Sequence, residues 1–162
     1  MNKKSKAIIK AVFALYAILM LWLLFGQRIG RDLFGSYWEM LQSNINLIPL
    51  QTIRIFINTL SSSDYGYALR HAIINLAGNV VMFVPLGFFI PSVFSKNSSF
   101  FRSMIICASI VVSIEVVQLF TLLGSCDIDD LILNLIGVAI GYGIYLIILQ
   151  EARKNGKAGK NS

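Results

Sequence analysis

Residues 113–142 read SIEVVQLFTLLGSCDIDDLILNLIGVAIGY, and this stretch decides the fold. Two apolar segments meet in it at a short corner that contains three aspartates: Asp127, Asp129 and Asp130. The segment before the corner carries Glu115 and Gln118 within an apolar run, and the segment after it begins with Asn134. A charge inside a long apolar segment is costly unless a partner or water satisfies it. The stretch therefore predicts one wall of a polar site in a membrane helix bundle.

The composition is that of a membrane protein. Of the 162 residues, 56% are hydrophobic and 14% are charged, whereas soluble domains carry about 25% charged residues. The basic residues gather in short blocks and not along one face, which argues against a nucleic-acid partner. Cys107 and Cys126 have no second Cys or His near them in the sequence. They are therefore poor zinc ligands, and we expect no metal and no cofactor.

Four apolar segments are long enough to cross a membrane, since about 20 helical residues cover the ~30 Å hydrocarbon core. We therefore expect an all-α membrane protein with spans at about residues 7–25, 72–93, 104–123 and 131–149. These spans form a single membrane domain over residues 11–149, between a basic segment at 1–10 and a basic tail at 150–162 that we expect to be disordered. The first apolar segment could also be a cleaved signal peptide. No small-x-small cleavage site follows it, which favours an uncleaved first helix.

The segment between the first two spans, residues 26–71, has mixed polarity. Four of its apolar residues recur at the spacing of one helix face: Ile53, Phe56, Ile57 and Leu60. This spacing predicts a short amphipathic helix that lies on the membrane surface or dips into it. Pro49 suits the start of that helix. A plain surface helix packed on the bundle would show the same pattern.

The basic residues indicate how the four spans are oriented. Most of the 14 Lys and Arg residues fall on one side of a four-span topology: Lys3, Lys4, Lys6, Lys10, Lys96, Arg102, Arg153, Lys154, Lys157 and Lys160. The turn at 124–130 has none. By the positive-inside rule, both termini lie in the cytoplasm, and the acidic corner and the 26–71 segment lie outside.

In this topology the polar side chains of three spans lie at similar depth, close to the outer surface: Asn75, Asn79, Glu115, Gln118 and Asn134. Three glycines share their faces and would let backbones approach closely: Gly78, Gly137 and Gly141. The simpler alternative for the Asn and Gln side chains is that they only join the helices to one another. A buried Glu115 carboxylate needs a base, several donors or a proton, and Arg54 and Arg70 are the outer bases that could reach it.

The corner aspartates have two possible roles. An aspartate at the start of a helix caps it and suits the positive end of the helix dipole. One aspartate is enough for that role, and the corner has three. We therefore expect the corner to bind a ligand as well.

Four motifs in this order resemble the VanZ-like family of bacterial membrane proteins. They are residues 46–49 (NLIP), 75–87 (NLAGNVVMFVPLG), 113–118 (SIEVVQ) and 127–137 (DIDDLILNLIG), and the resemblance covers roughly residues 44–146. It implies a multi-pass protein of the bacterial cytoplasmic membrane. The family's name member is associated with low-level resistance to teicoplanin, a glycopeptide that acts on cell-wall precursors outside the membrane. Many members have an Arg directly before the Asp-Ile-Asp-Asp motif, where this chain has Gly124-Ser125-Cys126.

The leading functional hypothesis is an envelope factor that is not an enzyme, although catalysis stays open. It would bind a lipid-linked cell-wall precursor, a lipid headgroup or a lipoglycopeptide at the outer leaflet, with membrane lipids as its surroundings and an oligomer as a possible state. The candidate binding residues are Asn75, Asn79, Glu115, Gln118, Asp127, Asp129, Asp130, Asn134 and Arg54.

Two alternatives belong to other classes. The first is an intramembrane enzyme acting on lipid-linked cell-wall substrates, with Glu115 and the corner aspartates as acid–base pairs or a cation site. His71 is the one histidine, and no Ser-His-Asp set, Cys-His pair or multi-His metal motif appears, so hydrolysis or transfer that needs a histidine base is poorly supported. The second is a small proton-coupled exporter in which Glu115 relays protons. The absence of similar polar side chains from the inner half argues against it.

Overall fold

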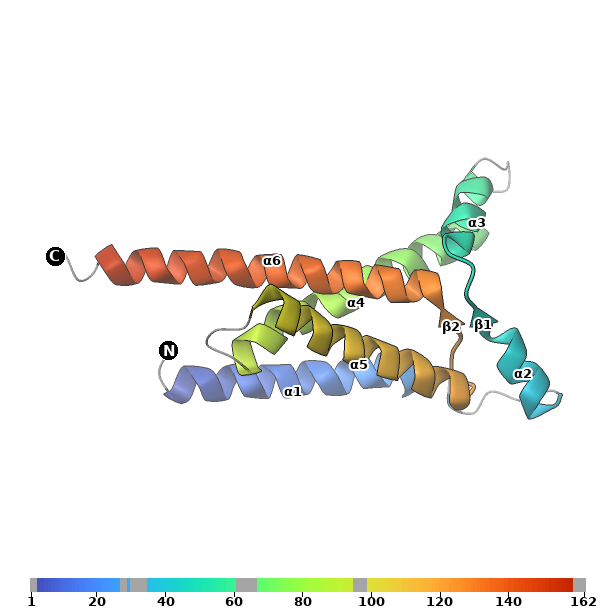
Figure 1. The fold of residues 1–162 in the computed structure, drawn as a ribbon, viewed down its shortest axis with the longest axis horizontal. Helices are drawn as coiled ribbons and strands as arrows, with labels where there is room; N and C mark the ends of the chain where they lie inside the picture. The colour runs from blue at the N-terminus through green and yellow to red at the C-terminus, as the bar shows by residue number, and fades with distance from the viewer. Residues whose placement is uncertain (1–2, 27–28, 30–34, 61–66, 95–98, 159–162) are drawn as a thin grey trace.

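The computed structural model of this chain describes residues 3–26, 29, 35–60, 67–94 and 99–158. Four long helices run alongside one another: α1 (Lys3–Phe25), α4 (Tyr67–Phe94), α5 (Phe100–Phe120) and α6 (Ile128–Ala158). Each contains a stretch that is long and apolar enough to cross a membrane. The expected all-α membrane fold with four spans is therefore confirmed (Figure 1).

The last helix is longer than predicted. α6 continues to Ala158, so the expectation of a disordered tail was wrong for residues 150–158. This segment contains good helix formers, and Lys154 lies 3.6 Å from Glu151 one turn earlier. The 31 residues of α6 span ~46 Å at ~1.5 Å each, which exceeds the ~30 Å hydrocarbon core. Figure 1 shows the end of α6 projecting beyond the start of α1.

The shorter elements gather at the opposite end of the bundle, which we call the corner end. They are α2 (Tyr37–Ser43), β1 (Ile45–Asn46), α3 (Gln51–Leu60) and β2 (Cys126–Asp127). β1 and β2 pair in parallel, with Ile45 opposite Cys126. α3 is the predicted amphipathic helix; it begins two residues after Pro49 and runs across the corner end beside the start of α4 (Figure 1). α2 was not predicted, although Glu39 accepts a hydrogen bond from the Ser36 N–H at 3.4 Å, as in a capping box.

The tightest helix pair is α4 with α6, and glycines explain why. A Cβ on Gly137 or Gly141 of α6 would overlap a main-chain oxygen of α4, and a Cβ on Gly87 of α4 would overlap a main-chain oxygen of α6. Small residues let membrane helices approach closely in this way. The same expectation for Gly78 was wrong, since a Cβ there would meet no described atom within 4 Å.

All four long helices contribute to one apolar core: Met20, Phe83, Leu86, Ile90, Cys107, Val111, Ile114 and Val138. α1 is held to α4 by the Tyr16 hydroxyl, which donates to the main-chain oxygen of Met82 at 2.8 Å. The rings of Phe13 and Phe89 also pack together, with their centroids 5.6 Å apart. The polar atom of Tyr16 is thus satisfied within the apolar layer, as a bilayer environment requires.

Candidate binding site at the acidic corner

The short parallel pairing brings together two segments that are far apart in the sequence. The Cys126 N–H donates to the carbonyl of Asn44 at 2.8 Å. The Asn46 Nδ2 donates to Oδ2 of Asp127 at 3.0 Å. Together these bonds fix the loop before α3 against the loop before α6.

Asp127 is the N-cap of α6. Its Oδ1 accepts a hydrogen bond from the Asp129 N–H at 2.8 Å, which is the pattern of an aspartate that satisfies a free donor in the first helical turn. Its second oxygen is the one that accepts from Asn46. Both oxygens of Asp127 are therefore used within the fold.

Asp129 caps a different helix from the one on which it lies. Its side chain is fully buried, and its carboxylate accepts from the N–H groups of Leu50 at 2.5 Å and Ile53 at 3.4 Å. These donors lie at the start of α3, where backbone N–H groups have no partner within their own helix. Asp129 thereby attaches α3 to α6, a role that local sequence does not indicate.

Asp130 and Asn79 form the link between α6 and α4. Asn79 Nδ2 donates to Oδ1 of Asp130, and both side chains are half-buried. Asn75 lies one turn earlier on α4 and is exposed. Asn75, Asn79 and Asp130, together with Glu115, Gln118 and Asn134, are called the polar cluster below. The first three are the part of it that is open at the surface.

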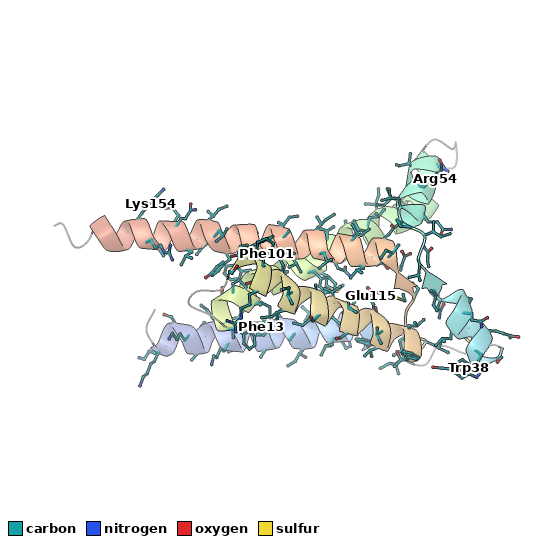
Figure 2. All side chains as sticks on the ribbon, viewed as in Figure 1. Phe13, Trp38, Arg54, Phe101, Glu115 and Lys154 are labelled. Atoms are coloured by element: carbon teal, nitrogen blue, oxygen red, sulfur yellow. The ribbon has the colours of Figure 1, made fainter. Side chains whose placement is uncertain are left out.

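Glu115 and Asn134 form the buried part of the cluster. Asn134 Nδ2 donates to Oε1 of Glu115 at 3.2 Å. Asn134 is only 2% exposed and Glu115 only 6%. Figure 2 places Glu115 between α5 and α6. The Oδ1 of Asn134 is buried and accepts no hydrogen bond from the described residues. Buried acceptors of this kind are uncommon and are often met by a ligand or water.

Gln118 connects the cluster to α1. Its buried side chain donates from Nε2 to the main-chain carbonyl of Leu24 at 3.3 Å. The main-chain carbonyl of Gln118 accepts a hydrogen bond from the Gly124 N–H at 3.2 Å. This is the helix-joining role that an amide can have in a membrane bundle.

Arg54 lies apart from Glu115. Its side chain is exposed on α3, and Figure 2 shows it at the far edge of the corner end. It forms no ion pair within the part of the chain that the structure describes. A role for Arg54 in binding stays a prediction.

The corner also contains the thiol of Cys126, which is half-buried. Burial raises the pKa of the Cys126 thiol, and the charges of Glu115 and Asp127 raise it further. The reactive thiolate is therefore disfavoured. Across the described ranges, no three His, Cys, Asp or Glu side chains come close enough together to hold a metal ion.

Two contributors were missed by reasoning from the sequence. Asn46 was noted as part of a motif but not as a partner of Asp127, which is 81 residues away. Tyr37 donates from its hydroxyl to the carbonyl of Phe120 at 2.9 Å and so attaches α2 to the end of α5. The Asn-Leu-Ile-Pro motif was the available signal for Asn46, and no signal pointed to Tyr37.

The profile of the VanZ/LLP1 family matches residues 13–149, which include α4, α5, the corner between α5 and α6, and most of α1 and α6. No curated protein and no solved structure matches the chain. The family match covers most of the 162 residues. The chain is therefore a member of the VanZ-like family of multi-pass membrane proteins.

Proposed function

We propose that this protein is an envelope factor of the cytoplasmic membrane. It binds an amphiphilic molecule at the outer surface of that membrane through its acidic corner. The ligand would be a lipid-linked cell-wall precursor, a lipid headgroup or a lipoglycopeptide. The observation that carries the proposal is the run of polar side chains from exposed Asn75 to buried Asn134, whose Oδ1 no described residue satisfies.

The arrangement of the cluster supports this proposal. Polar side chains continue from exposed Asn75, through half-buried Asn79 and Asp130, to buried Asn134 and Glu115. Carboxylate and amide oxygens dominate, so the matching ligand would carry hydroxyl, amide or ammonium donors. Sugars and peptides carry such groups, as do lipid headgroups with an amine or hydroxyl, so each of the proposed ligands can supply them.

The charge distribution supports the sidedness of the proposal. Lys3, Lys4, Lys6 and Lys10 lie on the first half of α1, and Arg153 and Lys154 lie near the end of α6. These residues are at the end of the bundle opposite the corner (Figure 1). Positive-inside orientation would place this basic end in the cytoplasm and the corner outside.

The test is a comparison of teicoplanin and vancomycin minimum inhibitory concentrations in cells that express the wild type or a variant. Glu115→Gln and Asp130→Asn remove a charge from the cluster with little change in shape. Glu151→Gln, on an exposed side chain near the end of α6, is the matched control. We expect the wild type and Glu151→Gln to raise the teicoplanin value, and both cluster variants to lose at least half of that increase at equal membrane levels.

Other outcomes would favour other functions. Unchanged resistance in both cluster variants would show that the corner is not the binding site. Resistance that disappears when the proton gradient is collapsed would favour the exporter. Turnover of a lipid-linked precursor by purified protein would favour the enzyme.

A further inference from the structure

A groove between α1 and α5 takes no part in the proposed binding site. Its volume is about 460 Å³, and its lining comes from α1, α5 and Leu86 of α4. This volume lies within the ~300–1,000 Å³ range of small-molecule sites. We infer that the groove holds one acyl chain of a membrane phospholipid.

Small residues in both walls account for the groove. Ala17 lies on the α1 wall, and Ser109 and Ser113 lie one turn apart on the α5 wall. Larger side chains of α1 line the same groove on either side of Ala17, among them Phe13 and Phe25. Small residues often allow two membrane helices to close together. Here α1 packs on α4 instead, so the space beside α5 stays open.

The lining suits hydrocarbon. The Ser109 hydroxyl donates to the carbonyl of Ile105 at 2.9 Å, and the Ser113 hydroxyl donates to the carbonyl of Ser109 at 2.7 Å. The Tyr16 hydroxyl donates to the main-chain oxygen of Met82. Each hydroxyl in the groove therefore has an acceptor within the protein, so a hydrocarbon chain would bury no unmatched donor there.

The position of the groove identifies its occupant. It follows α1 from Phe13 to Phe25, a length of ~18 Å at ~1.5 Å per residue. Both walls are segments long and apolar enough to span a membrane, so lipid chains surround them. An empty groove would forfeit the dispersion contacts of its lining atoms. An acyl chain that enters the groove restores those contacts.

A helix from a second copy of the chain is the competing occupant, since Ser109 and Ser113 have the small-xxx-small spacing found in helix dimers. A helix ~10 Å wide and ~18 Å long fills roughly 1,400 Å³, about three times the groove volume of about 460 Å³. A second helix could insert only a few side chains. A single extended chain fits along the groove.

This inference goes beyond the proposed function and does not depend on it. None of the corner residues lines the groove. Glu115→Gln should therefore leave lipid binding in the groove unchanged, whether or not it alters resistance.

The test is photocrosslinking in nanodiscs made of phosphatidylethanolamine and phosphatidylglycerol. The probe is a phosphatidylglycerol with a diazirine midway along one acyl chain, and mass spectrometry maps the labelled peptides. Ala17→Trp fills the groove from α1, and Ala14→Trp places the same side chain on an exposed face of α1. We expect labelling of the groove residues to fall at least five-fold in Ala17→Trp and to stay unchanged in Ala14→Trp.

Equal labelling in the two tryptophan variants, or labels spread evenly over all lipid-facing surfaces, would overturn the inference. A disulfide between copies of a Ser109→Cys variant that lacks both native cysteines, Cys107 and Cys126, would also overturn it, because a second copy would then occupy the groove. Helical content and monodispersity check that the variants fold. If Ala17→Trp does not fold, Ser113→Leu applies the same test from the α5 wall, with the same expected loss.

Discussion

The three corner aspartates differ in what surrounds them. Asp127 caps its own helix and binds Asn46, Asp129 caps α3 from a distance, and Asp130 binds Asn79. The number of acidic residues that first suggested a ligand site is thus partly explained by bonds within the fold. Of the three, Asp129 is fully buried, whereas Asp130 is half-buried and better placed to meet a ligand.

Asp129→Ala should release the start of α3. It removes a buried carboxylate that accepts from Leu50 and Ile53, and loss of a helix cap costs about 0.5–2 kcal/mol. We expect the Leu50 and Ile53 amides to exchange hydrogen about two- to thirty-fold faster, as that free energy implies, and the thermal midpoint to fall. Hydrogen–deuterium exchange measures the first effect. Glu39→Ala, at an exposed cap of α2, is the control and should leave α3 protected.

Cys126 should react slowly with maleimide. Burial and the carboxylates of Glu115 and Asp127 raise its pKa, so little thiolate is present at neutral pH. We expect the rate to rise only at pH values above the ordinary thiol pKa of ~8.5. The raised pKa favours the neutral Cys126 thiol in the folded state. The contribution of this thiol to stability is therefore fully present below its ordinary pKa of ~8.5 and is lost as the pH rises through the raised pKa of the folded state.

The control for this prediction is an exposed cysteine at the neighbouring position. Ser125→Cys in a Cys126→Ala background places the thiol on an exposed site. This thiol should react with maleimide faster at pH 7, and the pH midpoint of its reaction rate should lie near the ordinary thiol pKa of ~8.5. Equal rates and equal pH midpoints for the two cysteines would contradict the assigned environment of Cys126.

At the scale of elements, α4 and α6 form the most closely packed pair of the bundle. They run in parallel, with Gly137 and Gly141 of α6 against the main chain of α4 at Val80 and Val84. This contact fixes the register between the helices. The register in turn places Asn79 beside Asp130.

Gly141→Ala should destabilise this pair, because the new methyl group would overlap the main-chain oxygen of Val84. Overpacking of this kind costs about 1–3 kcal/mol. Gly143→Ala is the matched control two residues away, where a Cβ meets nothing within 4 Å. Replacing a glycine within a helix by alanine stabilises the helix by roughly 0.5–1 kcal/mol. Unfolding midpoints in mixed micelles should therefore move in opposite directions, and equal shifts would contradict the packing.

At the scale of the whole molecule, the bundle has a basic end and an acidic end. Lys154 marks the basic end, whereas the corner end holds Asp127, Asp129 and Asp130 beside Arg54 and Trp38 (Figure 2). Trp38 is 67% exposed, as suits an aromatic residue at a membrane–water interface. The helices between the ends carry mostly apolar side chains toward their surroundings.

Membrane-impermeant maleimide should label the two ends differently in intact cells. In a Cys107→Ala, Cys126→Ala background, Ser125→Cys should react from outside, and Lys154→Cys should react only after the membrane is permeabilised. Both positions are exposed, so accessibility within the protein does not separate them. The reverse pattern would invert the topology and place the polar cluster on the cytoplasmic side.

The sequence by itself determined the four spans and the amphipathic helix after Pro49, and it predicted a set of polar residues at one level of the bundle. These follow from local properties: hydrophobic length, helical periodicity and the cost of placing polar groups in hydrocarbon. The close packing at Gly137 and Gly141 also followed from small-residue spacing, whereas Gly78 has the same local appearance and no close contact.

Only the tertiary structure decided which polar groups meet. Asp129 binds backbone donors 79 and 76 residues away, and Asn46 binds Asp127 across the parallel strand pair. Contacts over such separations depend on how complete helices pack, and no local pattern in the chain records that packing. The groove between α1 and α5 has the same origin: its small residues are visible in the sequence, but the space they leave exists only because α1 packs on α4.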